Sequence, residues 1–120
     1  MMGFTPAQRY YLSREPADMR KSYDGLSGLV RQGLGRDPLS GEVFIFLNRR
    51  RTMIKILVWD RSGFVIWSKR LERGTFELPL RPEAGCSVAL AWEELVMILE
   101  GVSLGSVRRR KRYSGEKAAA

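Results

Sequence analysis

The sequence has no histidine and only one cysteine, and these two shortages narrow the chemistry available to the protein. Without histidine, neither a serine–histidine nor a cysteine–histidine nucleophilic pair can form, and a histidine-ligated metal site is excluded. The lone Cys86 excludes an internal disulfide and a metal site built from several cysteines. It fits a reducing cytoplasm, and we expect it to be a small buried residue.

Long hydrophobic runs are also missing, since no apolar stretch approaches the roughly 20 residues that span a bilayer. The first twelve residues lack the basic flank and apolar core of a signal peptide, so we predict a cytoplasmic protein without a membrane partner. Carboxylates such as Asp24 and Asp37 could bind Mg²⁺ only if folding gathered them, and Asp18 and Asp60 are better explained as a helix cap and a turn residue. The sequence therefore predicts a protein that is not an enzyme and needs no cofactor.

Positive charge is in excess: 21 lysines and arginines stand against 13 aspartates and glutamates, for a net charge of +8. Residues 49–81 carry nine basic and three acidic groups, and residues 105–120 carry six basic groups and one acidic group. Between them, residues 82–104 hold four glutamates and no base. Such segregation attracts a polyanion, with nucleic acid as the first expectation.

A chain of 120 residues with 44% hydrophobic content has room for one small globular domain. We place this domain at residues 1–104 and predict that the basic tail 105–120 is disordered, because it has no apolar periodicity. The predicted fold class is α+β: an antiparallel meander packed against one main helix, followed by a short C-terminal helix and the basic tail.

The meander is predicted from three segments rich in β-branched and aromatic residues, Glu42–Asn48, Met53–Trp59 and Phe64–Leu71. Their apolar residues fall on both faces, which is typical of strands covered on two sides. The loop Asp60–Gly63 predicts a hairpin with positive φ at its glycine. This hairpin would place Trp59 opposite Phe64 and align the aliphatic residues behind them, Leu57 with Ile66.

Helical spacing of apolar residues predicts a helix over residues 18–34, with Asp18 as its N-cap; the apolar stripe is Met19, Tyr23, Leu26, Val30 and Leu34. Gly25 and Gly28 within it indicate either close approach to the sheet or a weak helix. A second helix is predicted at Trp92–Glu100, closed by Gly101. Short strands are predicted at residues 7–13 and, as an edge strand, at residues 86–90.

Three consecutive arginines occupy the turn between the first two meander strands. A solvated turn needs no such charge density for folding, and guanidinium groups bind phosphates bidentately. The candidate nucleic-acid-binding residues, in the meander and the tail, are Arg49, Arg50, Arg51, Lys55, Lys69, Arg70, Arg73, Arg108, Arg109, Arg110, Lys111 and Arg112. The open alternatives are a solvated charged turn and a solubilising tail. Trp59 and Trp67 could stack on bases, but their aliphatic neighbours favour the core.

Several short runs in a fixed order give the chain a family resemblance. They are Asp18-Met19-Arg20-Lys21, Asp24-Gly25-Leu26, Asp37-Pro38-x-Ser40-Gly41, Phe44-x-Phe46-x-Asn48-Arg49-Arg50, Lys55-Ile56-Leu57-x-Trp59-Asp60-x-x-Gly63, Lys69-Arg70-Leu71-Glu72-x-Gly74-x-Phe76 and Leu99-Glu100-Gly101-Val102. Over residues 5–104 the chain resembles the small accessory protein, called TnpB or second open reading frame, of the insertion-sequence family numbered sixty-six. It departs from that pattern at Ala91, where relatives tend to carry Ser or Thr, and at Leu78-Pro79, where they have Trp-Pro.

The resemblance implies a bacterial mobile element with a separate, larger DDE transposase, and an accessory protein needed for efficient transposition. We therefore expect a non-enzymatic accessory factor in transposition and DNA recombination that contacts DNA through its basic residues. The alternative is a protein adaptor without DNA contact. It would use the acidic second helix (Glu93, Glu94 and Glu100) or an apolar sheet face to bind the transposase or a second copy, as a homo-oligomer.

Overall fold

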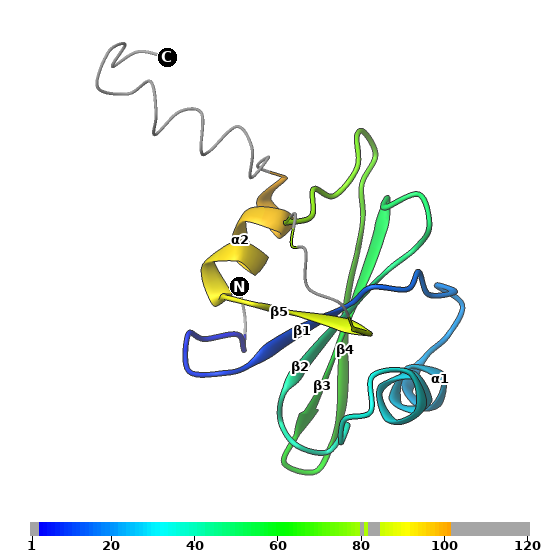
Figure 1. The fold of residues 1–120 in the computed structure, drawn as a ribbon, viewed down its shortest axis with the longest axis vertical. Coiled ribbons are helices and arrows are strands. Elements are labelled where there is room, and N and C mark those ends of the chain that lie inside the picture. The colour runs from blue at the N-terminus through cyan, green and yellow to red at the C-terminus, as the bar shows by residue number, and fades with distance from the viewer. Residues whose placement is uncertain (1–2, 80, 82–84, 102–120) are drawn as a thin grey trace.

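The computed structural model describes residues 3–79, 81 and 85–101, and within them one five-stranded sheet is flanked by helices (Figure 1). The elements are β1 (Tyr10–Ser13), α1 (Tyr23–Gly28), the π-helix η1 (Leu29–Gly33), β2 (Val43–Leu47), β3 (Met53–Asp60), β4 (Gly63–Arg70), β5 (Ser87–Leu90) and α2 (Trp92–Glu100). The strand order is β4-β3-β2-β1-β5. The predicted α+β class is confirmed, and the predicted tail lies outside the described residues.

The predicted meander forms the β2-β3-β4 part of the sheet, and its register is the predicted one. Trp59 pairs with Phe64 and Leu57 with Ile66, and the Trp59 and Phe64 rings meet edge to face with centroids 5.1 Å apart. One detail of the hairpin is wrong. The positive φ falls on Arg61 (55°) and not on Gly63, because the Ser62 N–H closes the turn back onto the Asp60 carbonyl.

The other two strands extend the meander beyond β2. β1 pairs with β2 in parallel, with Tyr10 opposite Val43, and pairs with the edge strand β5 in antiparallel fashion. A parallel pair needs a long crossover, and here it passes through α1 and η1. β1 is shorter than the predicted segment 7–13, whereas β5 lies where the edge strand is predicted.

The first helix is shorter than predicted, and the prediction of Asp18 as its N-cap is wrong. The Asp18 carboxylate instead accepts the Arg20 backbone N–H at 2.9 Å in a local turn, and α1 starts at Tyr23, which is 48% exposed rather than part of the core. Close approach of Gly25 and Gly28 to the sheet is also wrong. A Cβ on Gly25 would meet the Lys21 side chain at 3.0 Å, and one on Gly28 would meet nothing within 4 Å.

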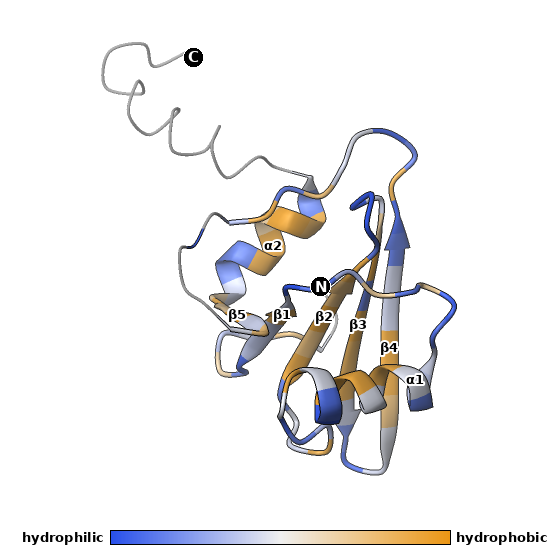
Figure 2. Cartoon of the chain, turned by 45° about the vertical axis from the view of Figure 1, so that its right-hand side comes forward, coloured by the Kyte–Doolittle hydropathy of each residue, from blue (hydrophilic) through white to orange (hydrophobic). Residues whose placement is uncertain are grey.

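Two hydrophobic layers lie on the two faces of the sheet, and all five residues of β2 are buried between them. One layer packs under α1 and η1 and contains Phe44, Phe46, Leu57, Leu26 and Val30. The other contains Val43, Ile45, Leu47, Ile54, Ile56, Phe76, Leu95, Ile98 and Leu99, beneath α2. Figure 2 shows the hydrophobic stretches of β2–β4 between these helices. The predicted coverage of the meander on two sides is confirmed.

Helix α2 has its predicted bounds and ends at Gly101, which has φ 78°. Ala91 stands at the N-cap without a side-chain acceptor, but its backbone N–H donates to the Glu94 carboxylate at 2.9 Å. Glu94 also forms an ion pair with Arg81. The prediction that Cys86 is buried is wrong, because its side chain is exposed just before β5.

Candidate nucleic-acid interface

The β2–β3 turn and the loop after β4 lie at the same end of the sheet, which we call the basic end (residues 48–55 and 69–76) (Figure 1). Met53 at the start of β3 pairs with Arg70 at the end of β4. Beyond this pair, the Leu71 N–H donates to the Thr52 carbonyl at 2.8 Å, and the Phe76 N–H donates to the Arg51 carbonyl at 2.7 Å. Because Phe76 is fully buried, it anchors the loop against the turn.

The turn that carries the three arginines is held by Asn48. Its side-chain oxygen accepts the N–H groups of Thr52 (2.9 Å) and Met53 (3.0 Å), and its amide donates to the Thr52 hydroxyl at 3.0 Å. Arg51 takes φ 58°, and its N–H donates to the Asn48 carbonyl at 3.0 Å. The backbone is therefore fixed by short polar contacts, while the arginine side chains extend into solvent.

Arg49, Arg50, Arg51 and Arg73 are exposed, and their guanidinium groups make no hydrogen bond or ion pair with a described residue. They are therefore available to an anionic ligand. Arg70 is exposed but forms an ion pair with Glu72 at 3.2 Å. The predicted tail residues 108–112 lie outside the described residues.

The two candidate lysines are engaged by the fold. Lys55 Nζ donates to the Lys21 carbonyl at 2.8 Å, in the segment before α1. Lys69 Nζ donates to the Leu99 carbonyl at 2.8 Å, in the last turn of α2. Because side chains alternate along a strand, Lys55 and Lys69 lie on opposite faces of the sheet. The structure thus brings the predicted residues of the meander to one end of the sheet but does not place them on a single face.

Sequence reasoning missed Arg14, which lines a hollow of about 230 Å³ together with Arg49 and Arg51. Arg14 follows β1, and because β1 and β2 run parallel, its position lies beside the β2–β3 turn. No local pattern in the sequence indicates this pairing, since about thirty residues separate the two strands.

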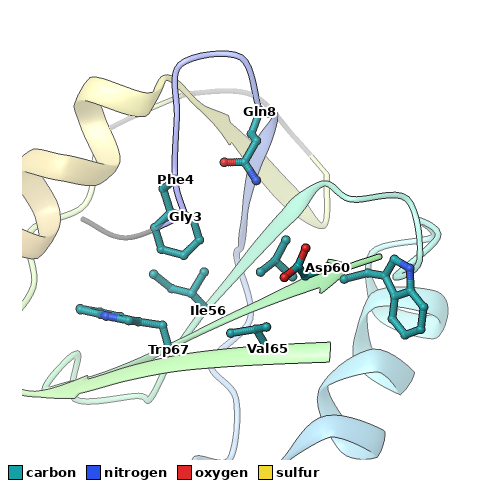
Figure 3. A pocket seen from close by; sticks show the side chains of 9 residues that line it. Gly3, Phe4, Gln8, Ile56, Asp60, Val65 and Trp67 are labelled. Carbon is teal, nitrogen blue, oxygen red and sulfur yellow. The ribbon is translucent and has the colours of Figure 1, made fainter. Parts of the chain in front are cut away.

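A second, apolar hollow of about 340 Å³ lies nearer the other end of the sheet, between the N-terminal segment and β3–β4 (Figure 3). Phe4, Ile56, Val65 and Trp67 surround it, with Asp60 at its rim (Figure 3). Trp67 also packs against the α2-side core, and both Trp67 and Trp59 are half-buried. Neither is as deeply buried as the core interpretation predicts, and neither lies among the arginines of the basic end.

Two ion pairs lower the pKa of carboxylates that lie away from the three arginines of the turn. Arg36 donates two N–H groups to the Glu42 carboxylate, each at 3.1 Å, and thereby lowers the pKa of Glu42. Likewise, hydrogen bonds from Arg20 hold the pKa of the exposed Asp18 carboxyl well below its ordinary value. In the part of the chain that the structure describes, no group of three or more His, Cys, Asp or Glu side chains could hold a metal ion. Nor does any described helix combine the length and hydrophobicity needed to cross a membrane.

A family model described as "IS66 Orf2 like protein" matches residues 8–109 of this sequence. The chain belongs to the IS66 Orf2-like family. The resemblance drawn from the ordered motifs is thereby confirmed, and it extends across both core layers and the basic end. Membership of the IS66 Orf2-like family supports an accessory role in the transposition of an insertion sequence.

Two relatives from Sinorhizobium fredii (strain NBRC 101917 / NGR234) are similar over most of their length. The uncharacterized protein y4jC is 30% identical over 110 residues, which are 92% of this chain and 92% of y4jC. The uncharacterized protein y4hO is 30% identical over 94 residues, which are 78% of this chain and 80% of y4hO. No solved structure matches the chain significantly.

Proposed function

We propose that this IS66 Orf2-like protein is a non-enzymatic factor that binds DNA through its basic end and assists a separate transposase. The observation that carries the proposal is the fixed turn at residues 48–52, which presents Arg49, Arg50 and Arg51 to solvent without a described protein partner. Arginines with no structural contact are the ones free to neutralise phosphates. Arg73, on the loop bonded to that turn, adds a fourth guanidinium group.

The proposed contact is mainly with the phosphates of the DNA backbone. Guanidinium groups bind phosphate oxygens as bidentate donors, and phosphate contacts set position and affinity rather than sequence. Half-buried Trp59 and Trp67 lie away from the turn, so they offer no stacking surface beside the arginines. We therefore propose that the basic end binds duplex DNA with little sequence preference.

The test is fluorescence anisotropy of a labelled duplex carrying the element's end sequence, titrated with the full chain at several salt concentrations. A triple Arg49/Arg50/Arg51→Ala variant should bind more weakly, and its slope of log affinity against log salt should be shallower by about 2.7, because three phosphate contacts are lost. The matched control removes three exposed arginines outside the basic end, Arg9/Arg31/Arg61→Ala, and should retain the slope.

Two further arms separate the competing interpretations. Replacing Arg108, Arg109, Arg110, Lys111 and Arg112 with alanine tests the tail, and loss of binding in this variant alone would reassign the contact to the tail. A scrambled duplex tests sequence readout. Equal behaviour of the triple variant and its control would refute the proposal for the basic end.

A second candidate function is self-association at β4, an edge strand beside the apolar hollow with Val65 46% exposed. In an antiparallel pairing of two copies of β4 centred on Ile66, Val65 faces Trp67 of the second copy. A Val65→Glu variant should then be monomeric in sedimentation equilibrium while the wild type is dimeric. A monomeric wild type would exclude this function.

A further inference from the structure

Strand β4 is an open edge of the sheet. It stands at one end of the strand order, and among the described residues no backbone hydrogen bond joins residues 63–70 to a segment other than β3. Edge strands are usually protected from further pairing by charges, by proline or by a short length. The other edge strand, β5, has four residues, whereas β4 has eight. Residues 63–67 of β4 contain neither a charge nor a proline, so this part of the edge is open to a further strand.

The apolar hollow lies beside this unprotected part of the edge. Val65 and Trp67 belong to β4 and line the hollow, and Figure 3 shows Phe4 of the N-terminal segment on its other side. Val65 is 46% exposed and Trp67 is half-buried. Because alternate side chains of a strand share a face, an added strand would place every second side chain beside Val65 and Trp67. Edge and hollow therefore offer backbone hydrogen bonds and apolar contact to the same extended segment.

A negative charge at the rim of the hollow determines what such a segment should carry. Asp60 is the charged residue among the described lining residues, and its exposed carboxylate has no described hydrogen bond or ion pair. Asp60 pairs with Gly63, the first residue of β4. A Cβ on Gly63 would meet no other atom within 4 Å, so the space between the edge and Asp60 is open. A lysine or arginine placed opposite Gly63 in an added strand can therefore reach the carboxylate.

These positions define the sequence pattern of the segment that fits. An antiparallel strand meets Trp67, then Val65, then Gly63 on this face, so the pattern is apolar-x-apolar-x-basic from its N-terminal side. A second copy of β4 centred on Ile66 would place Lys69 opposite Gly63, but the Lys69 ammonium already donates to the Leu99 carbonyl. The occupant that fits is therefore a different chain, whose basic side chain is free.

We propose that the open edge of β4 and the apolar hollow bind an extended segment of another protein with the pattern apolar-x-apolar-x-basic. The segment adds a strand to the sheet and brings its basic residue to Asp60. This inference goes beyond the proposed function and does not depend on it, because the β3–β4 hairpin and the basic end lie at opposite ends of the sheet (Figure 1). One molecule can then hold DNA and a protein partner at the same time.

The test uses the full chain and a fluorescent synthetic peptide that carries the pattern, Ser-Thr-Val-Thr-Val-Thr-Lys-Thr-Ser. The wild type should bind it about tenfold more tightly than the same peptide with glutamate in place of lysine, because an attractive cross-strand pair is exchanged for a repulsive one. The net charge of +8 by itself favours the glutamate peptide, so a preference for lysine reports the local carboxylate. Asp60→Lys should reverse the preference.

The matched control is Asp24→Lys, which makes the same charge change at an exposed position of α1 outside the hollow and should keep the wild-type preference. Asp60→Asn covers the case in which Asp60→Lys fails to fold, and it should lose the preference for lysine while its circular dichroism spectrum stays unchanged. Hydrogen exchange tests the strand addition, since the bound peptide should slow the exchange of alternate β4 amides. Peptide binding without this protection would overturn the proposed geometry.

Three other outcomes would overturn the inference. These are no binding of the lysine peptide by the folded wild type, the same preference in Asp60→Lys as in the wild type, and tighter binding of a peptide with the sequence of residues 63–71, which would favour a second copy. The proposed function fails separately, because the Arg49/Arg50/Arg51→Ala variant should bind the lysine peptide like the wild type. A protein that binds the peptide but not DNA would refute the basic end and leave the β4 site intact.

Discussion

Replacing Lys69 with methionine should lower the free energy of unfolding and leave DNA binding unchanged. This is expected although the position of Lys69 in the sequence favours a phosphate contact. Lys69 Nζ donates to the Leu99 carbonyl at 2.8 Å. Carbonyls in the last turn of a helix have no intrahelical partner, and a cation there interacts favourably with the helix dipole. Lys69 therefore connects β4 to α2 through a charged hydrogen bond, and its ammonium group is already occupied.

The expected loss of stability follows from three contributions of Lys69, two favourable and one unfavourable. A hydrogen bond from a charged donor stabilises by about 1.5–3 kcal/mol, and the dipole interaction adds about 0.3–1 kcal/mol. Ordering a lysine side chain costs up to about 2 kcal/mol. The net loss on Lys69→Met should be about 1 kcal/mol, which lowers the melting temperature of a domain of this size by about 4–8 °C.

Thermal unfolding by circular dichroism and DNA anisotropy below the transition measure the two properties separately. Arg73→Met is the matched control, because Arg73 is exposed and has no described partner. It should keep its melting temperature and have a shallower salt slope. The reasoning is refuted if Lys69→Met keeps the wild-type melting temperature and loses salt slope as Arg73→Met does, since Lys69 would then contact DNA and not α2.

Two other predictions concern the stability of the domain. Glu42→Gln should destabilise it by about 1–2 kcal/mol at neutral pH, because Arg36 donates two hydrogen bonds to that half-buried carboxylate. Since Arg36 lowers the pKa of Glu42, this contribution is complete above the ordinary value of 4.5, and the difference between the variant and the wild type should shrink as chemical denaturation is repeated at lower pH. Ala91→Ser should raise the melting temperature by several degrees, because the N-cap backbone is extended and Glu94 already supplies the other half of a capping box.

The meander and α2 could be predicted because their information is local. The hairpin between β3 and β4 has a loop of two residues, so the loop fixes the register that pairs Trp59 with Phe64. The apolar residues of α2 recur at helical spacing, and Gly101 ends it with positive φ. The first helix was predicted too long, because apolar spacing at Met19 and Tyr23 continued past a backbone turn held by Asp18.

The candidate site was predictable at the turn and not elsewhere. Three successive arginines after a buried strand indicate an exposed, charged turn in any fold that keeps the hairpin. The roles of Lys55 and Lys69 depend on the segment before α1 and on the end of α2, which approach the sheet only in the folded chain. The position of Arg14 depends on the parallel pairing of β1 with β2, which leaves no periodic pattern.

The same geometry explains why the free charge gathers at an end of this sheet. A strand sends successive side chains to opposite faces, and helices cover both faces here, so lysines on the strands reach backbone carbonyls of the covering segments. At the basic end, Arg49, Arg50 and Arg51 in the turn and Arg73 in the loop make no such contact with a described residue. These four arginines can neutralise about four phosphates, so the salt slope of the described basic end should be no steeper than about −3.6. A steeper measured slope would mean that there are additional phosphate contacts. If the slope becomes shallower when the protein is diluted below the dissociation constant of a dimer, a second copy makes these contacts. If the slope becomes shallower when residues 108–112 are neutralised, the tail makes them.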